Sequence, residues 1–174
     1  MKLSLSNGIF SKLSLEENFE AVLTLNFEYL EFNMKSVKKE NDTDVYRESR
    51  LLEETGLKCL TLHAAILHMK DPVEVHRAVY YSKISLECAH ALNAPIMTVH
   101  SNVSKKLSRQ VREQCLTGVF GEIKPLAKKL GIKLALENLS YTSSGFGKNV
   151  EQLEEIFDVV DPEGEMGMTF DLCH

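Results

Sequence analysis

The sequence predicts an α/β protein in which apolar strands alternate with helices. Four apolar segments each end in a residue that can bind a metal ion or carry a proton, namely His63, His100, Glu137 and Asp171. Before each of the first three stands a Gly or Asn, the residues that close a helix in the left-handed conformation. The segments recur at similar intervals, since 37 residues separate His63 from His100 and His100 from Glu137, and 34 separate Glu137 from Asp171.

The N-terminal elements have their own signals. Residues 3–6 alternate in the manner of a strand. Ser14 and Glu17 form a capping box that begins a helix ending near Leu25. Residues 27–32 are rich in aromatic and branched side chains, so we expect the second strand there.

A polar loop over residues 35–44 leads into a helix that ends at Gly56, and the pattern then repeats. The later strands are expected at 59–63, 96–100, 133–137 and 168–171. The residues that end the helices before the first three of these strands are Gly56, Asn93 and Gly131. Asp71 and Pro72 supply an N-cap and a first-turn proline for a helix to Leu92.

The last helix begins at Asn149, with Gln152 three residues on, and runs to about Val160. The dipeptide Asp161–Pro162 ends it. Parallel strands joined through helices need right-handed crossovers, which place the helices outside and the strands inside. The nearly continuous apolar strands agree with a parallel sheet that is covered on both faces.

Such a chain can form one of two architectures, an open doubly wound sheet or a (β/α)8 barrel. Residues 7–10 read Asn-Gly-Ile-Phe, which is no Gly-rich phosphate loop, so a dinucleotide fold is disfavoured. Successive strands all carry polar residues at their C-terminal ends, which favours the TIM-barrel type. A complete barrel takes about 250 residues. We therefore expect residues 1–174 to form a single, incomplete TIM-barrel domain with about six of the eight βα units.

The composition is that of a globular domain with a real core, with 44% apolar and 26% charged residues. A net charge of −5 gives no reason to expect nucleic acid or an anionic membrane as a partner. The chain begins with a strand pattern rather than a signal peptide, and no apolar stretch approaches the roughly 20 residues that cross a bilayer. The four cysteines form no CxxC pair, so we expect single thiols and a cytoplasmic location.

The strand ends resemble those of a known family. The segments concerned are Leu-His-Ala-Ala at 62–65, Val-His-Ser at 99–101, Leu-Glu-Asn-Leu at 136–139 and Phe-Asp-Leu-Cys-His at 170–174. They are similar to the xylose-isomerase-like TIM-barrel superfamily, which includes sugar phosphate isomerases, epimerases and endonuclease IV. The resemblance extends over essentially the whole chain as strands 1 to 6. Glu-Asn after the fifth strand and Asp-x-x-His after the sixth are its most specific parts.

The resemblance implies a role for each matching residue. Glu137 and Asp171 match metal-binding carboxylates, and His174 matches a histidine that contacts substrate in the epimerases and a metal in the endonuclease. His63 and His100 match histidines that line the pocket of sugar isomerases and bind zinc in the endonuclease. The family also supplies a histidine from a seventh strand and a glutamate from an eighth, which have no counterpart among these 174 residues.

These residue types suit proton transfer beside a carbonyl, where a divalent cation stabilises the enediolate. Carboxylates and imidazoles are suitable ligands for Mn, Mg, Co or Zn. The expected metal ligands are Glu137, Asp171 and His174, of which Glu137 and His174 are also the expected catalytic residues. The expected substrate-binding residues are His63, His100, Glu31 and Asn138.

Our first hypothesis is therefore a divalent-metal-dependent isomerase or epimerase of a sugar or sugar phosphate, with a small carbohydrate as partner. The first alternative is a zinc-dependent apurinic/apyrimidinic endonuclease like endonuclease IV, for which DNA would be the partner. The second is an inactive barrel fragment with an assembly or regulatory role, completed by another copy of itself in a homo-oligomer.

Other features have a structural interpretation beside the functional one. A single histidine at a strand end is more often a hydrogen-bonded structural residue, and surface or packing roles are expected for His68, His76 and His90. Two basic clusters would touch a sugar phosphate or a DNA backbone, or else be ordinary solvated helix faces. They are Lys35, Lys38 and Lys39, and Lys105, Lys106, Arg109 and Arg112. Residues 142–148 are mostly small, which suits close approach to a phosphate or sugar as well as a featureless loop.

Overall fold

The computed structural model describes residues 2–10, 12–34, 45–65 and 69–174. Six parallel strands form one sheet in the order β1-β2-β3-β4-β5-β6. The strands are β1 Ser4–Ser6, β2 Tyr29–Asn33, β3 Lys58–His63, β4 Ile96–Val99, β5 Lys133–Glu137 and β6 Gly167–Thr169. Because the strand order never reverses, the doubly wound alternative is excluded.

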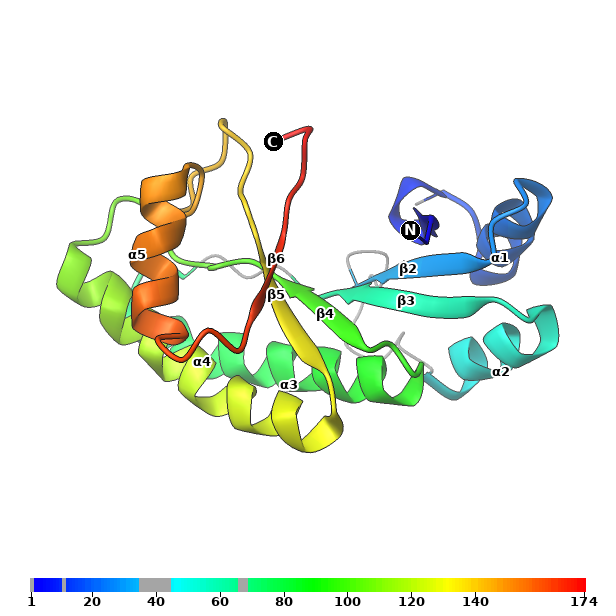
Figure 1. The fold of residues 1–174 in the computed structure, drawn as a ribbon, viewed down its shortest axis with the longest axis horizontal. Helices are drawn as coiled ribbons and strands as arrows, with labels where there is room; N and C mark the ends of the chain where they lie inside the picture. The colour runs from blue at the N-terminus through cyan, green and yellow to red at the C-terminus, as the bar shows by residue number, and fades with distance from the viewer. Residues whose placement is uncertain (1, 11, 35–44, 66–68) are drawn as a thin grey trace.

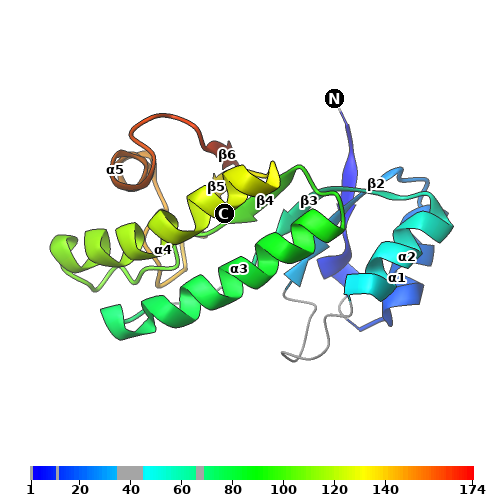
Figure 2. The ribbon, with the colours of Figure 1, turned by 90° about the horizontal axis from the view of Figure 1, so that it is seen from below.

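Helices alternate with the strands, as the sequence predicts. They are α1 Leu15–Thr24, α2 Val45–Thr55, α3 Val75–Ala91, α4 Arg109–Leu130 and α5 Val150–Val160. The short 3-10 turns η1 Asn7–Phe10 and η3 Pro72–Glu74 precede α1 and α3. Helices α2, α3 and α4 lie along one side of the sheet in Figure 1, and Figure 2 shows α3 and α4 packed side by side. None of the helices in the described part of the chain has the length and apolar character needed to cross a membrane.

The predicted helix N-termini are confirmed by their capping hydrogen bonds. Ser14 and Glu17 make both bonds of the capping box. The Asp71 side chain accepts a hydrogen bond from the Val73 N–H at 2.8 Å and so caps the 3-10 turn η3, which runs directly into α3. The Asn149 side chain accepts one from the Gln152 N–H at 3.1 Å. The three residues expected to close helices have positive φ, namely Gly56 (72°), Asn93 (54°) and Gly131 (71°).

Two strands differ from their predicted ranges by two residues at one end, and three others differ by a single residue. The second strand begins at Tyr29 rather than at residue 27, because the Phe27 N–H donates to the Val22 carbonyl and still closes α1. The last strand ends at Thr169 rather than at Asp171, because the Asp171 N–H donates to the Asn138 side chain. The predicted loop at 35–44 lies outside the described residues.

The pleat of the strands separates an apolar face from a polar one. Leu30, Leu62 and Leu136 are fully buried in the core that the helices cover. Because successive side chains of a strand point to opposite faces, their neighbours Glu31, His63 and Glu137 lie on the other face. Packing of the apolar face therefore fixes the positions of the strands, and with them the polar side chains on the opposite face.

Candidate metal centre

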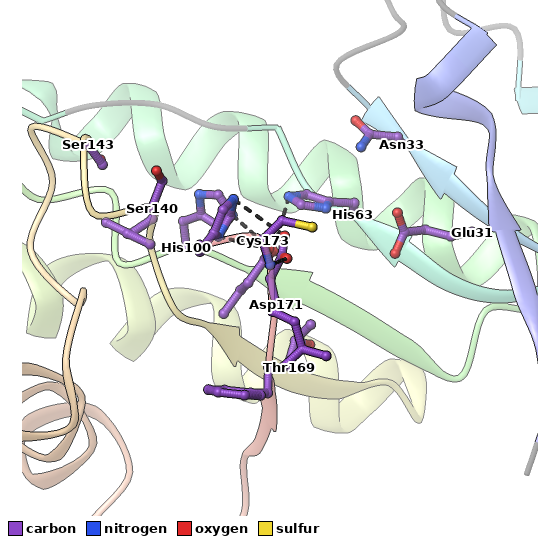
Figure 3. A pocket seen from close by; sticks show the side chains of 14 residues that line it. Glu31, Asn33, His63, His100, Ser140, Ser143, Thr169, Asp171 and Cys173 are labelled. Carbon is purple, nitrogen blue, oxygen red and sulfur yellow. Dashed lines mark hydrogen bonds and ion pairs between the residues drawn. The ribbon is translucent and has the colours of Figure 1, made fainter.

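A pocket of about 600 Å³ lies at the C-terminal ends of the strands. Its lining includes six of the seven residues predicted for the site, namely Glu31, His63, His100, Glu137, Asp171 and His174. The residues come from β2, β3, β5 and the segments that follow β4 and β6. Figure 3 shows Glu31, His63, His100 and Asp171 around one space. The parallel sheet therefore brings together side chains that are far apart in the sequence.

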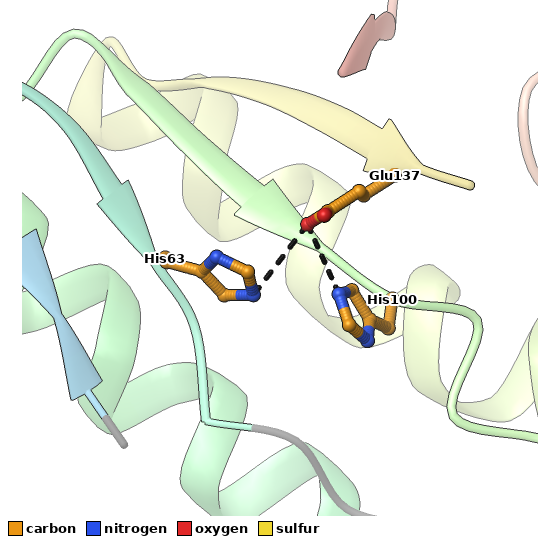
Figure 4. Close-up of side chains that lie close together, drawn as sticks. All are labelled: His63, His100 and Glu137. Atoms are coloured by element: carbon orange, nitrogen blue, oxygen red, sulfur yellow. Dashed lines mark hydrogen bonds and ion pairs between the residues drawn. The ribbon is translucent and has the colours of Figure 1, made fainter. Parts of the chain in front are cut away.

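Two buried histidines converge on one carboxylate oxygen. His100 Nε2 lies 3.0 Å from Glu137 Oε2, and His63 Nε2 lies 3.5 Å from the same oxygen (Figure 4). The two imidazole rings meet edge to face with their centroids 5.1 Å apart. Glu137 is only 4% exposed, so its carboxylate sits where water screens its charge little.

A second group of ligand atoms shares the same glutamate. His174 Nδ1 lies 3.7 Å from Glu137 Oε1, and His174 Nε2 lies 3.4 Å from Asp171 Oδ2. In each triad the three ligand atoms lie within 4.8 Å of one another. Glu137 therefore turns one oxygen toward His63 and His100, and the other toward His174.

Asn138 fixes the position of Asp171. Its side-chain amide donates to the Asp171 carbonyl at 3.0 Å, and its side-chain oxygen accepts from the Asp171 N–H at 2.8 Å. The Asn138 backbone carbonyl lies 2.7 Å from His174 Nδ1. A carbonyl can only accept, so Nδ1 is the donor in this contact, and in the neutral imidazole Nε2 then has the lone pair that a metal requires.

The family model described as "Xylose isomerase-like TIM barrel" matches residues 19–174. The chain belongs to the xylose isomerase-like TIM-barrel family. The match spans most of the chain and includes every residue of both triads. It confirms the resemblance read from the strand ends, and with it the predicted barrel fold type.

Among curated proteins, the chain is similar to family relatives that are longer than it is. It is 24% identical over 184 residues to an uncharacterised protein of Methanocaldococcus jannaschii, covering 100% of this chain and 61% of that protein. It is 24% identical over 145 residues to a probable endonuclease 4 of Acholeplasma laidlawii, covering 80% and 49%. The chain thus spans about half to three fifths of the length of these relatives.

Solved structures of similar proteins agree on the fold. A D-tagatose 3-epimerase-like protein superposes with a TM-score of 0.70 at 22% identity, over 99% of this chain and 65% of that one. The IolI protein with a bound zinc atom gives 0.76 at 19% identity, over 97% and 62%. At such identities these similarities establish the TIM-barrel fold type and no more.

The donor atoms present in this family member fit a divalent cation. Each triad offers imidazole nitrogen and carboxylate oxygen within a few ångströms, the ligands that Zn and Mn take in proteins. Cys59 and Cys88 are poor sources of a thiolate ligand, because burial raises the pKa of each to about 12. Cys115 is buried as well, and Cys173 is exposed.

Glu31 faces the pocket from β2. Burial raises its pKa, and the negative charges of Glu137 and Asp171 raise it further, while hydrogen bonds from Ser6 and Thr61 oppose the shift. Thr61 Oγ1 lies 3.4 Å from the carboxylate. A carboxyl group with a raised pKa suits proton exchange with a substrate.

The sequence did not single out every residue of the pocket. Ser140, Thr169 and Cys173 also line it, as does Ser143 from the small-residue segment 142–148, whereas Asn138 holds the Asp171 backbone. The small hydroxyl residues directly after β5 were a signal for Ser140 and Ser143. His76 and His90 are exposed on α3, in accord with their expected surface role, and His68 lies outside the described residues.

Proposed function

We propose that this protein is a divalent-metal-dependent isomerase or epimerase that acts on a sugar or sugar phosphate. The observation that carries the proposal is the buried Glu137 carboxylate, which lies between two histidines and the Asp171–His174 pair. The similarity to an epimerase-like structure and to a zinc-binding one supports it. The expected substrate is a small carbohydrate, and we expect the protein to act in the cytoplasm.

The roles of the residues follow from their positions. Glu137, Asp171 and His174 Nε2 would hold the cation, which when bound supplies Lewis acidity toward a substrate carbonyl. Glu137 Oε2, beside His100 Nε2, is the atom that we assign to take the proton from the carbon next to that carbonyl. His63 and His100 would bind substrate hydroxyls. Glu31 would bind the end of the substrate that reaches β2.

The test is Glu137→Gln, measured by calorimetric titration with Mn²⁺ and by turnover of ketoses and their phosphates. The amide cannot carry the ligand charge or the proton, so we expect no turnover. Mn²⁺ affinity should fall more than about tenfold, because mutation of residues that only support metal ligands already lowers metal affinity by about that factor. Glu154→Gln, on the exposed side of α5, is the control and should change neither quantity. Full turnover of Glu137→Gln would exclude the proposed role.

One observation favours the endonuclease alternative. Glu137 belongs to both triads, which is the arrangement that two cations sharing a carboxylate would need. A curated relative is also a probable endonuclease 4. Against it, Arg109 and Arg112 are paired with Glu113 and Glu155, which weakens the basic surface after β4. Two bound Zn²⁺ per chain together with nicking of a duplex that carries an abasic site would decide for this activity.

A further inference from the structure

The part of the pocket that β2 forms contains two polar side chains outside both triads. Glu31 and Asn33 line the pocket, and because they are two residues apart on one strand, they point to the same face of the sheet. Figure 3 shows the Glu31 carboxylate directed into the pocket from this side, with Asn33 at the end of the same strand. Neither residue belongs to a triad. A ligand that extends from the triads toward β2 therefore meets these two side chains.

The Glu31 carboxylate is held by hydroxyl groups from the two neighbouring strands. In the register of the sheet, Ser6 of β1 and Thr61 of β3 stand directly beside Glu31. Thr61 Oγ1 donates to Glu31 Oε2 at 3.4 Å, and the Ser6 side chain also forms a hydrogen bond with the carboxylate. A carboxylate can accept about four hydrogen bonds. Glu31 therefore has the capacity to accept from hydroxyls of a ligand as well.

Asn33 is fixed by the turn η1 that follows β1. Its backbone N–H donates to the side-chain oxygen of Asn7 at 2.8 Å, and Asn7 is only 1% exposed. A Cβ on Gly8 would lie 3.1 Å from Asn33 Nδ2, so the turn packs closely against the Asn33 side chain. In the register, Asn33 stands beside His63 of β3. The Asn33 amide is thus held at the strand end, next to the first histidine of the pocket.

The charges on this side of the pocket favour a neutral ligand over an anion. Burial raises the pKa of Glu31, and the charges of Glu137 and Asp171 raise it further. A negative potential that opposes ionisation of a carboxyl group also opposes the approach of a phosphate dianion. A cation in the triads would offset the charges of its own ligands and leave that of Glu31. Among the described residues that line the pocket, there is no lysine or arginine to offset it.

We propose that Glu31 and Asn33 form a subsite for the hydroxylated tail of the substrate, which accepts a neutral sugar chain and excludes a phosphorylated one. Glu31 accepts hydrogen bonds from neighbouring hydroxyls of the tail, and the Asn33 amide binds the next hydroxyl along the chain. The reacting carbons lie at the triads, and the tail extends toward β2. The substrate is then a free sugar rather than a sugar phosphate. This inference rests on the proposed function, because it specifies the substrate class of that site.

The test is a titration with sorbitol, followed by the NMR chemical shifts of the metal-free and the Zn²⁺-loaded protein. Sorbitol is an open hexose chain without the carbonyl, so it binds without reacting. Glu31→Met should lower sorbitol affinity by about tenfold or more, the contribution of hydrogen bonds to a charged group. Asn33→Leu should lower it by a smaller factor, because hydrogen bonds to neutral groups contribute less. Glu20→Met, at an exposed position on α1, is the matched control and should leave sorbitol affinity unchanged.

Sorbitol 6-phosphate tests the exclusion of an anion with the same carbon chain. The wild type should bind it more weakly than sorbitol. Glu31→Gln removes the charge and should bind the phosphate more tightly than the wild type does. Its amide oxygen still accepts from Ser6 and Thr61, so this variant keeps the inference testable if Glu31→Met does not fold. No sorbitol binding by the wild type, equal affinity for the two ligands, or an equal loss in Glu20→Met would overturn the inference.

Zn²⁺ binding by the same variants separates this inference from the proposed function. Glu31→Met should keep a Zn²⁺ affinity close to that of the wild type, because Glu31 is in neither triad. If the protein binds sorbitol through Glu31 but binds no Zn²⁺, the proposed function fails and the subsite stands. If the protein binds Zn²⁺ and interconverts ketoses while Glu31→Met binds sorbitol normally, the proposed function stands and the subsite is wrong.

Discussion

Glu137 and Asn138 are adjacent at the end of β5 but have different roles, because their side chains contact different groups. Glu137 faces the pocket and both triads. Asn138 turns its amide to the Asp171 backbone, and its carbonyl to His174 Nδ1. The pleat of the strand makes this division possible. Two adjacent residues therefore supply one candidate ligand and the hydrogen bonds that orient Asp171 and His174.

A second buried carboxylate, Asp161, has a structural role that a mutation can measure. Its oxygens accept hydrogen bonds from Lys124 Nζ at 2.8 Å and from the backbone N–H groups of Glu165 and Met166 at 3.2 and 2.8 Å. Burial alone would raise its pKa, but these hydrogen bonds prevail and hold the pKa below the ordinary 3.8. Asp161 thus joins α4, the end of α5 and the approach to β6.

We expect Asp161→Asn to lower the free energy of unfolding at pH 7 by about 1.5–3 kcal/mol, the usual contribution of hydrogen bonds to charged groups. A carboxylate whose pKa is lowered by folding stabilises the protein above its unfolded pKa and loses that effect as the pH falls through the folded value. The difference between wild type and variant should therefore shrink below pH 3.8. Urea unfolding at neutral and acid pH measures both effects.

The control for this experiment is Asp158→Asn, an exposed position on the same helix. Surface substitutions of this kind stay within about 0.5 kcal/mol. An Asp161→Asn variant as stable as Asp158→Asn at pH 7, or a difference that grows in acid, would contradict the structural role.

At the scale of elements, local signals in the sequence were sufficient to predict the helix ends that depend on local interactions. The caps at Ser14, Asp71 and Asn149 and the left-handed residues Gly56 and Gly131 were predicted and are confirmed. These features depend on hydrogen bonds or backbone angles within a few residues. The pattern of strand ends was likewise sufficient to predict that Glu137, Asp171 and His174 lie together at one rim.

Features that depend on distant contacts could not be predicted from the sequence. The early end of β6 depends on the side chain of Asn138, and the position of the loop after β5 depends on the bridge between Ser104 and Gly145. Neither interaction is marked by a periodic pattern or a characteristic spacing of residues in the sequence. Asn138 was predicted to bind substrate from the family resemblance of the Glu-Asn pair, and the structure adds hydrogen bonds from its side chain to the Asp171 backbone that the sequence did not indicate.

Helix α4 offers two glycines at which the same substitution should have opposite effects. Gly131 ends the helix at φ 71°, where a Cβ is strained, so Gly131→Ala should destabilise the fold by about 1 kcal/mol. Gly121 lies inside the helix with open space around it, so Gly121→Ala should stabilise by about 0.5–1 kcal/mol. Thermal unfolding compares them. Equal shifts of the same sign would show that backbone angle does not decide stability at these positions.

At the scale of the whole molecule, the sheet has two edges in the part of the chain that the structure describes. Strand β1 pairs with β2 and β6 pairs with β5, and among the described residues neither edge strand has a second neighbour. The β6 side exposes apolar side chains, with Met168 at 48%, Phe170 at 68% and Leu172 at 87%. An edge of this kind tends to pair with another strand.

We therefore predict that a polypeptide of residues 1–174 alone self-associates through β6, as the homo-oligomer hypothesis requires. Sedimentation velocity should show a mean mass that rises with protein concentration. Met168→Lys places a charge on the edge and should shift the equilibrium toward the monomer, because a buried lysine opposes strand pairing. It should leave Mn²⁺ binding unchanged, since Met168 is not a ligand.

Val73→Lys is the control for that experiment, because Val73 is 82% exposed on η3, away from the sheet edge. It adds the same charge and should leave the association unaltered. A wild type that stays monomeric at every concentration would show that the exposed edge is tolerated alone. If Met168→Lys and Val73→Lys weaken the association equally, the change in net charge is the cause. An interface at β6 requires that only Met168→Lys weakens it.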